Sequence, residues 1–381
     1  MRRFRADTFV RVLAVMLAIL ATYFVWSGCG RSYTPKSVDL FLKYTIEYGA
    51  DSGRGNVLGI QPYMLNGDYS SQQSFQAKMD GYLREAQKLG WLNPKTVIVL
   101  PEYLGAWLVV AGEKRGIYTS FTIENAMKIL VSSNLFPFAW AAVFSPAQDR
   151  LKYAVFKIKA ASMAGIYDRV FSSLARKYRV TLVAGSIILP SPSVVRGRLV
   201  IGEGPLYNVL PVYLPNGKVS SSLVFKAFPT KDEKVFLKGR EVENLPVVNT
   251  PLGKLGVLIC ADAWYPKSYE VMKRKRASIV AAPSFIIGDR AWEETWHGYS
   301  GAANPEDVQK ADVGRITEKQ AWMKYALAGR LLKSGIPDGI MVCLRGRLWD
   351  LGSDGSTVVV WKGKAANTPN VEGAALVNLW L

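Results

Sequence analysis

Three polar residues stand where an apolar, strand-like run of the sequence ends or is interrupted, and their types together suit nucleophilic catalysis. Glu102 follows TVIVLP, Cys260 closes LGKLGVLIC, and Lys226 lies within LVFKAF. Sites in α/β folds lie at such strand ends. A carboxylate that is partly desolvated has a raised pKa and suits a general base, and a thiol before a helix N-terminus can be stabilised as thiolate. The pattern therefore predicts a cysteine nucleophile served by a glutamate.

Each residue also has an ordinary structural interpretation. Glu102 could cap a helix or face solvent, Cys260 could be a small buried hydrophobe, and Lys226 could snorkel from an edge strand. Cys343, within GIMVCLRG, keeps that ordinary interpretation. The single His297 argues against a histidine-rich zinc site and against Ser-His or Cys-His chemistry, because any such mechanism would have to pass through this one ring.

Lys226 carries the further requirement of a counter-charge. If its apolar segment packs into the protein, the ammonium group stays protonated only beside a carboxylate. Glu102 and Glu233 are the candidates.

Alternating strand-like and helix-like runs predict an α/β layered architecture. Strands are expected at 56–65, 96–100, from 180, 206–214, 252–260, 278–284, 339–344 and 356–361, the segment 206–214 forming a hairpin with a turn at 215–217; helices are expected near 75–89, 160–177, 266–275 and 318–334, after a polar stretch at 33–53. No repeat or low-complexity linker divides the body, which indicates one domain over residues 35–381 after an N-terminal segment 1–34.

Taken in order, Pro101-Glu102, Phe225-Lys226 and the strand end GVLICAD around Cys260 resemble the nitrilase (carbon-nitrogen hydrolase) superfamily. The resemblance covers roughly residues 55–360. The stretch KAFPTKDE resembles the K-L-K-P-T-x-x-E segment of the nitrilase and cyanide-hydratase branch, which would make Glu233 the family's accessory glutamate. The resemblance implies a four-layer α-β-β-α sandwich.

It also implies a mechanism without metal or organic cofactor. Glu102 takes the proton of Cys260, the thiolate attacks a carbonyl or nitrile carbon, and Lys226 and the Ala261 N–H meet the oxyanion, while Glu233 orients Lys226 or the substrate. Candidates for the substrate pocket are Tyr103, Trp264 and Ser284.

Two departures from the family pattern leave the substrate class open. Lys231 stands where that branch commonly has His, and the late Arg-Ala-x-Glu helix is present only as YALAGRLL. Neither feature supplies the nucleophile, the base or the oxyanion donor.

The N-terminus has the order of an export signal: MRRFR, then VLAVMLAILATYFVW, then SGCGRS. Val12 to Trp26 would rise only about 22 Å as a helix, short of a ~30 Å hydrocarbon core, unless the span extends to Phe9 with Arg11 snorkelling. Ser27-Gly28-Cys29 resembles the end of a lipobox, with Cys29 as the lipidation candidate, although Trp26 departs from it. Lipoprotein, uncleaved anchor, clean secretion and a buried core helix all stay open, and the first three place the domain on the extracytoplasmic side of the membrane.

The formal charge of +18 and the KRKR run at 273–276 come with no nucleic-acid-binding signature, so anionic lipid is the better partner than nucleic acid. The apolar insertion after Glu102, with GAWLVV and LFPFAWAAVF, suits ordinary core or a lid that dips into the bilayer surface. A small or acylated amide or nitrile is the expected substrate, and a homo-oligomer is compatible with the sequence. An N-acyltransferase related to the apolipoprotein enzyme and a non-catalytic binding module are the alternative functions.

Overall fold

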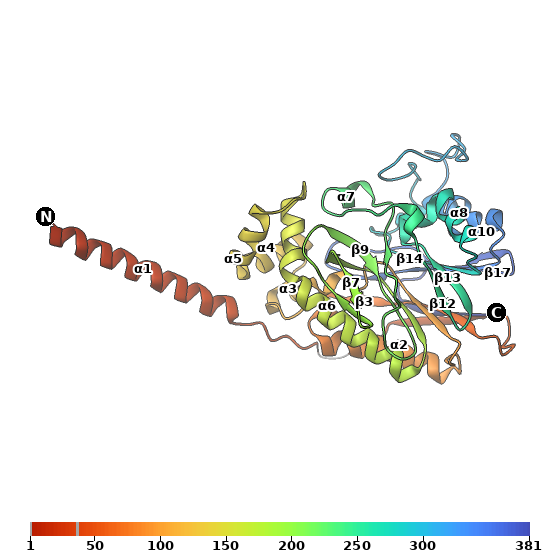
Figure 1. The fold of residues 1–381 in the computed structure, drawn as a ribbon, viewed down its shortest axis with the longest axis horizontal. Helices are drawn as coiled ribbons and strands as arrows, with labels where there is room; N and C mark the ends of the chain where they lie inside the picture. Colours follow the sequence, from red (N-terminus) through yellow and green to blue (C-terminus); the bar gives the residue numbers. More distant parts are fainter. Residues whose placement is uncertain (1, 36–37) are drawn as a thin grey trace.

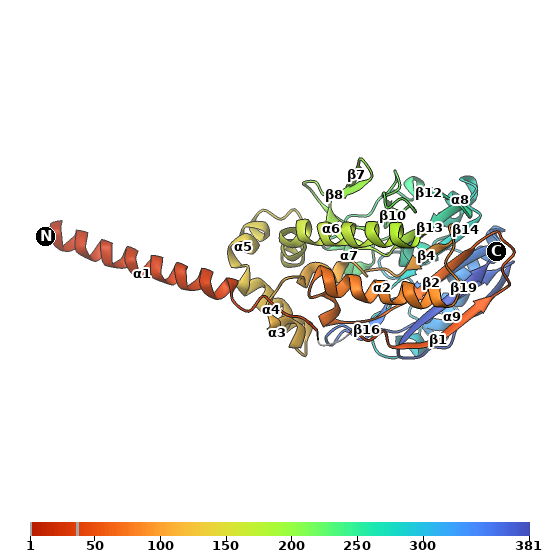
Figure 2. The ribbon, with the colours of Figure 1, turned by 90° about the horizontal axis from the view of Figure 1, so that it is seen from below.

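The computed structural model describes residues 2–35 and 38–381, except the side chains of residues 2–6, so the arginine side chains of the expected signal lie outside the described part. Two six-stranded sheets pack face to face, and helices cover the outer face of each (Figures 1 and 2). The molecule is therefore a four-layer α-β-β-α sandwich from which one long helix projects.

The first sheet contains the strand that precedes Glu102. Its order is β1 (Leu42–Tyr48), β19 (Ala374–Trp380), β2 (Asn56–Gln61), β4 (Val97–Leu100), β5 (Thr181–Ala184) and β10 (Val212–Tyr213). The central strands β2, β4 and β5 run parallel and are buried along their whole length. This burial on both faces explains their unbroken apolar sequences. Helices α2 (Gln72–Lys88) and α6 (Arg150–Tyr178) cover the outer face.

The second sheet has the order β12 (Val247–Thr250), β13 (Gly253–Val257), β14 (Ile279–Ser284), β15 (Asp338–Cys343), β17 (Val358–Trp361) and β18 (Lys364–Asn367). Helices α8 (Pro266–Arg274), α9 (Glu318–Tyr325) and α10 (Leu327–Ser334) pack on its outer side. The two sheets approach closely at Gly59 of β2, where a Cβ atom would lie 2.6 Å from Cδ1 of Ile340. A larger residue here would have to displace the side chains of Ile340 and Val342, so glycine allows the two sheets to pack closely at this point.

Smaller elements complete the fold. A three-stranded sheet joins β11 (Val224–Phe225), β9 (Leu206–Leu210) and β6 (Ile187–Pro190). The others are β3 (Tyr63–Leu65) paired with β16 (Arg345–Arg347), β7 (Ser193–Val195) paired with β8 (Arg198–Val200), the short helix α7 (Lys231–Lys234), and the 3-10 turns η1 (Asn66–Tyr69), η3 (Val242–Asn244), η4 (Cys260–Trp264) and η5 (Ala291–Glu293).

The apolar insertion between β4 and α6 forms a helical cap at one end of the sandwich. It consists of η2 (Ala106–Val110), α3 (Arg115–Thr119), α4 (Ile123–Ser133) and α5 (Leu135–Val143). The N-terminal helix α1 (Arg2–Gly28) projects from this same end (Figures 1 and 2). The insertion and the N-terminal segment, far apart in sequence, thus meet.

Several expected elements differ from the structure. The strand expected at 56–65 divides at Pro62 into β2 and β3, which belong to different sheets. The polar stretch 33–53 contains β1, which pairs with β19 along one edge of the first sheet. The strand expected from 180 divides into β5 and β6 at Gly185, which has a φ of +76°. The helix expected at 318–334 breaks at Ala326 into α9 and α10. The run 206–214 divides into β9 and β10, which belong to different sheets, while the expected turn at 215–217 is present and lets the Leu214 N–H donate to Lys218 O at 2.8 Å. Local sequence patterns could not reveal these breaks because tertiary pairing decides them.

Candidate active site

Glu102 lies directly after β4, where the chain turns sharply. The turn is fixed by Tyr103, which has a φ of +59° and whose N–H donates to Ser186 Oγ at 2.8 Å. The Glu102 side chain is only 1% exposed. Burial raises its pKa, and although the ammonium group of Lys226 opposes this effect, the net pKa stays above the ordinary value. Glu102 is therefore a carboxylate prepared to accept a proton.

Lys226 follows β11 and lies between two carboxylates. Its Nζ is 2.8 Å from Glu102 Oε1 and 2.8 Å from Glu233 Oε2. Burial by itself would lower the pKa of Lys226, but the negative charges of Glu102 and Glu233 outweigh it and raise the pKa well above its usual range. Lys226 is thus a fixed buried cation, as its apolar neighbours in the sequence required. The structure brings both expected partners to it.

Glu233 sits in the first turn of α7 and is held by its own helix. Its Oε2 accepts the N–H of Thr230 at 2.7 Å in a capping box, and Oε1 accepts the hydroxyl of Tyr103. Burial pushes the pKa of Glu233 upward, but Lys226 and these donors lower it below the ordinary value. The two glutamates therefore differ: Glu233 is the permanent counter-ion of Lys226, and Glu102 is the more basic group.

Cys260 begins η4, three residues after β13 ends, instead of closing the strand itself as expected from the sequence. Its φ of +48° is a left-handed conformation, which is strained for a residue with a side chain. The Sγ atom is buried and lies 3.9 Å from the carbonyl oxygen of Phe285. Burial raises the pKa of the Cys260 thiol well above its usual range, and the charge of Glu102 raises it further against the opposing effect of Lys226. The resting thiol is neutral and needs a base.

Asp262 connects the cysteine turn to the lysine segment, a role that sequence reasoning did not assign to it. Its Oδ1 accepts the N–H groups of Ala227 and Phe228 at 3.0 and 2.8 Å, and its Oδ2 accepts that of Ile259 at 3.2 Å. The side chain is completely buried, and burial raises its pKa to about 7 despite these donors. Asp262 thus fixes the chain on both sides of the site.

Asn208 of β9 was also missed as a site residue. Its Nδ2 donates to Glu102 Oε1 at 2.9 Å and to Glu233 Oε1 at 3.3 Å. It holds the two carboxylates in place from the face of the three-stranded sheet. The pair Tyr207-Asn208 within the apolar run LYNVL was the available signal, because a polar side chain inside a buried strand needs partners.

The other expected site residues have varied surroundings. Ala261 is the second residue of η4. The first hydrogen bond of that turn runs from the N–H of the next residue, Asp262, to Ile259 O. Trp264 packs against Trp296 and Trp322 in the core beneath the second sheet. Ser284 Oγ donates to the carbonyl of Ala282 at 3.1 Å. The oxyanion role of Ala261 and the substrate-pocket roles of Tyr103, Trp264 and Ser284 stay predictions.

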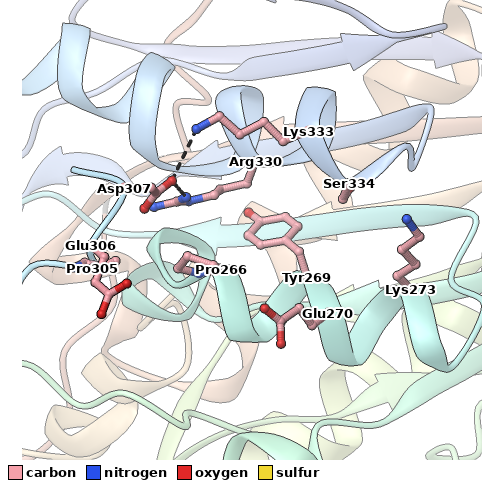
Figure 3. A pocket seen from close by; sticks show the side chains of 10 residues that line it. All are labelled: Pro266, Tyr269, Glu270, Lys273, Pro305, Glu306, Asp307, Arg330, Lys333 and Ser334. Carbon is pink, nitrogen blue, oxygen red and sulfur yellow. Dashed lines mark hydrogen bonds and ion pairs between the residues drawn. The ribbon is translucent and has the colours of Figure 1, made fainter. Parts of the chain in front are cut away.

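Arg330, from the segment YALAGRLL, binds the last residue of η4. Its Nε lies 3.0 Å from the carbonyl oxygens of Trp264 and Tyr325, and its guanidinium also pairs with Asp307. Figure 3 shows this group lining a cavity of about 510 Å³ between α8 and α10, with Lys333 also directed at Asp307. None of Glu102, Lys226 and Cys260 lines this cavity. It is separate from the candidate site, and Arg330 acts on the site only through the end of η4.

His297 lies in the loop after η5 and is exposed to solvent. The buried cluster thus consists of a thiol, a basic carboxylate and an ammonium group, supported by a second carboxylate and two neutral donors, Asn208 and Tyr103.

The four-layer α-β-β-α fold is the one that the resemblance to the nitrilase superfamily implies, and it brings Glu102 and Lys226 together as expected. Residues 77–303 match the sequence profile of the carbon-nitrogen hydrolases, and the chain belongs to that family. Among solved structures, it is similar to a carbon-nitrogen hydrolase from Helicobacter pylori G27, with a TM-score of 0.53 and 18% identity over 85% of this chain and 89% of that one. It is also similar to an amidase from Nesterenkonia sp. AN1 in complex with acrylamide, with a TM-score of 0.51 and 15% identity over 87% and 93% of the two chains. These likenesses concern the fold.

Curated relatives match over shorter stretches. A bifunctional nitrilase/nitrile hydratase from Nicotiana tabacum is 25% identical over 216 residues, which are 53% of this chain and 57% of the relative. A probable hydrolase from Bacillus subtilis is 27% identical over 124 residues, or 32% of this chain and 21% of the relative. The matched stretches thus span little more than half of one relative and about a fifth of the other.

Proposed function

We propose that this protein hydrolyses a non-peptide C–N bond, in an amide or a nitrile, through a thioester or thioimidate on Cys260. The observation that carries the proposal is the position of Lys226, which is buried between Glu102 and Glu233 at 2.8 Å from each. A lysine that served only to neutralise one carboxylate would not need a second carboxylate beside it. With both in place, Glu233 satisfies the ammonium charge while Glu102 exchanges a proton.

The reaction on an amide follows from these charges. Glu102 removes the proton of the Cys260 thiol as sulfur attacks the carbonyl carbon, so that the C–S bond forms and the carbonyl becomes an oxyanion. Lys226 and the Ala261 N–H stabilise that oxyanion. When the C–N bond breaks, Glu102 returns its proton to the leaving nitrogen and an amine departs.

Hydrolysis of the thioester reverses the roles. Glu102 takes a proton from water, the hydroxide attacks the thioester carbon, and the C–S bond breaks to release a carboxylic acid and regenerate the thiol with the proton of Glu102. The raised pKa of Glu102 suits both directions of transfer, because a stronger base removes the first proton and a weak acid is still able to return it.

Solved relatives support the assignment to cysteine. A glutamate-to-glutamine variant of the Nesterenkonia amidase carries the acetamide moiety of fluoroacetamide covalently on its active-site cysteine, and the present chain is similar to it with a TM-score of 0.50. That adduct forms by displacement of fluoride and leaves the C–N bond intact, so it supports a reactive thiol at the equivalent place, and the thioester on Cys260 is proposed from the site geometry.

The test is a covalent adduct. The full-length protein is incubated with a panel of amides, nitriles and esters, quenched in acid and digested, and the peptide around Cys260 should be heavier by one acyl group. Glu102→Gln, which cannot accept the thiol proton or return it to the leaving nitrogen, should lower the rate at which this acyl adduct forms from an amide. His297→Ala, a matched control at an exposed position, should leave it unchanged. An acyl group on a serine, or loss of labelling in His297→Ala alone, would overturn the assignment.

Membrane attachment through α1, with the domain on the extracytoplasmic side, is proposed from the helix itself. The apolar stretch Asp7–Gly28 is 22 residues long, and none of it is buried within the described chain. At ~1.5 Å per residue it rises about 33 Å, enough for a ~30 Å hydrocarbon core and longer than the Val12–Trp26 core alone.

Contacts at the end of α1 favour the uncleaved anchor over the lipoprotein. Helical hydrogen bonding continues to Cys29, whose N–H donates to Val25 O at 3.0 Å, and Ser27 Oγ donates to Ser133 O at 2.6 Å. The intact mass of the membrane-extracted protein tests this choice. A chain that begins at an acylated Cys29 would select the lipoprotein instead.

A further inference from the structure

We propose that α5 and the turn after it form a second membrane contact, lying in the bilayer interface beside α1, so that the hydrolase domain is docked on the lipid surface and does not swing on a tether. This proposal rests on α1 remaining attached to the domain. It adds to the proposed function a defined face of the molecule and a defined partner, the lipids of the membrane that α1 crosses.

The surface of α5 is apolar where a soluble protein would be polar. No charged residue lies between Lys128 and Asp149. Within α5 only Phe138 is buried, while a group of large apolar side chains on and after the helix is exposed, Trp140 by 70% and Phe144 by 65%. We call this group the α5 patch: Leu135, Phe136, Trp140, Val143 and Phe144. A contiguous apolar surface of this kind marks an interaction site.

The α5 patch is continuous with the last turns of α1. The ring of Phe136 stacks on that of Phe24 at 5.7 Å and meets that of Tyr23 edge-on at 5.2 Å. The hydroxyl of Tyr23 accepts the N–H of Leu135 at 2.9 Å and donates to Ser132 O at 3.2 Å. Lipid that surrounds the end of α1 must therefore also reach α5. Figures 1 and 2 both show α5 at the end of the domain from which α1 projects.

A buried carboxylate holds α1 and the cap in one arrangement. Glu113, which is 0% exposed, lies 2.7 Å from Arg31 after α1 and 2.7 Å from Lys159 of α6, and it accepts Nδ2 of Asn134 between α4 and α5 at 3.2 Å. A buried carboxylate that binds three segments keeps them together, because separating any of them leaves its charge unpaired. The α5 patch thus has a fixed position relative to α1.

The residue types suit the interface in particular. Trp140, Trp26 and Tyr23 are the amphipathic aromatic residues that gather at the headgroup level of membrane proteins. Lys114 lies with its ammonium group 4.5 Å from the ring centre of Trp26, and the exposed Arg115 follows it. Basic residues beside an aromatic belt match anionic headgroups, in keeping with the formal charge of +18. A second copy of the chain is the competing occupant of the patch.

The test uses full-length protein in nanodiscs made with brominated phospholipids, which quench tryptophan fluorescence on contact, and in nanodiscs of the unbrominated lipids. The quenched intensity is the fluorescence lost between unbrominated and brominated nanodiscs. It should be smaller in Trp140→Phe, which keeps an aromatic ring, than in the wild type. It should be unchanged in the matched control Trp361→Phe, because the indole of Trp361 donates to Trp380 O at the C-terminal end of the domain. Equal quenched intensity in the wild type and Trp140→Phe would overturn the proposal.

A second measurement separates the bilayer from a partner copy. Phe144→Glu should weaken the protection of residues 135–144 from hydrogen exchange in nanodiscs and leave the number of chains per disc unchanged. The control Leu332→Glu on α10 should change neither the protection of these residues nor the number of chains per disc. Loss of a dimer on Phe144→Glu would assign the α5 patch to a second copy and overturn the membrane contact. If no adduct forms on Cys260 but Trp140 is still quenched by brominated lipid, the proposed chemistry is wrong and the proposed membrane contact stands.

Discussion

One carboxylate oxygen of Asp262 accepts the backbone N–H of Phe228 at 2.8 Å, and so joins the turn that presents Cys260 to the segment that presents Lys226. Burial raises the pKa of Asp262 to about 7. In the unfolded chain the same group titrates near pH 4. Between these values the native state holds a proton that the unfolded state has lost.

We predict that Asp262 makes the protein less stable as pH rises from about 4 to 7, because the folded state then binds more protons than the unfolded state. The slope from this one group is at most about 1.4 kcal/mol per pH unit. Denaturant unfolding at several pH values measures it. Asp262→Asn, which does not titrate, should show a smaller slope in this window. An equal slope in both proteins would remove Asp262 as its source.

Lys226→Met should lower turnover by about 100-fold or more, the effect of removing one oxyanion donor. The position of Lys226 adds a cost in stability, because two buried carboxylates lose their shared cation. That cost is about 3–5 kcal/mol for a broken buried pair. The double variant Lys226→Met/Glu233→Gln should regain part of the stability and none of the turnover. Recovered turnover in the double variant would reduce Lys226 to a structural residue.

Asn208→Leu should move the acid limb of the rate profile to higher pH. The side-chain amide of Asn208 donates to Glu102 Oε1 at 2.9 Å and so stabilises the charged form of Glu102. Loss of this hydrogen bond should raise the pKa of Glu102 further. Because the base must be unprotonated to act, the rise in kcat/KM then occurs at higher pH. Tyr103→Phe, which removes a donor to Glu233 instead, should shift the limb less. An unmoved limb in Asn208→Leu would contradict the positioning role.

Arg330→Met should lower the midpoint of thermal unfolding by about 5 °C or more, because a buried cation that binds two carbonyl groups is lost. Turnover should fall with it, since the Trp264 carbonyl lies at the end of the turn that begins at Cys260. Lys333→Met is the matched control, as Lys333 also pairs with Asp307 but is exposed. Equal effects of the two variants would place the contribution in Asp307 instead.

Deletion of residues 1–34 removes the anchor together with Arg31. The proposed catalytic residues all follow that segment, so the proposed activity on small soluble amides should persist, but Glu113 loses one of its two cationic partners. A chain that begins at Gly30 keeps Arg31 and should be more stable than the shorter one by about 1–3 kcal/mol. Denaturant unfolding in mild detergent compares them. Identical midpoints would indicate that Arg31 does not hold the cap.

The sequence alone determined those features that depend on residues near each other in the chain. The buried parallel strand before Glu102 was readable because its residues are all apolar, and the α/β fold and the family expected from Glu102, Lys226 and Cys260 are confirmed. The apolar run from Val12 to Trp26 was equally visible, because hydropathy is a local property, and the structure extends the helix around it to Asp7–Gly28.

Only the tertiary structure decided which groups meet. Asn208 and Glu102 are 106 positions apart, and no local pattern paired them. The sequence offered Glu102 and Glu233 as candidate partners of Lys226, but only the fold shows that this one lysine serves both carboxylates. The pKa directions of the site follow from that pairing and from burial, which are properties of packing. The contact of Phe136 with Phe24 arises in the same way: each segment shows by itself that it is apolar, but that the two rings stack depends on how the folded chain brings them together.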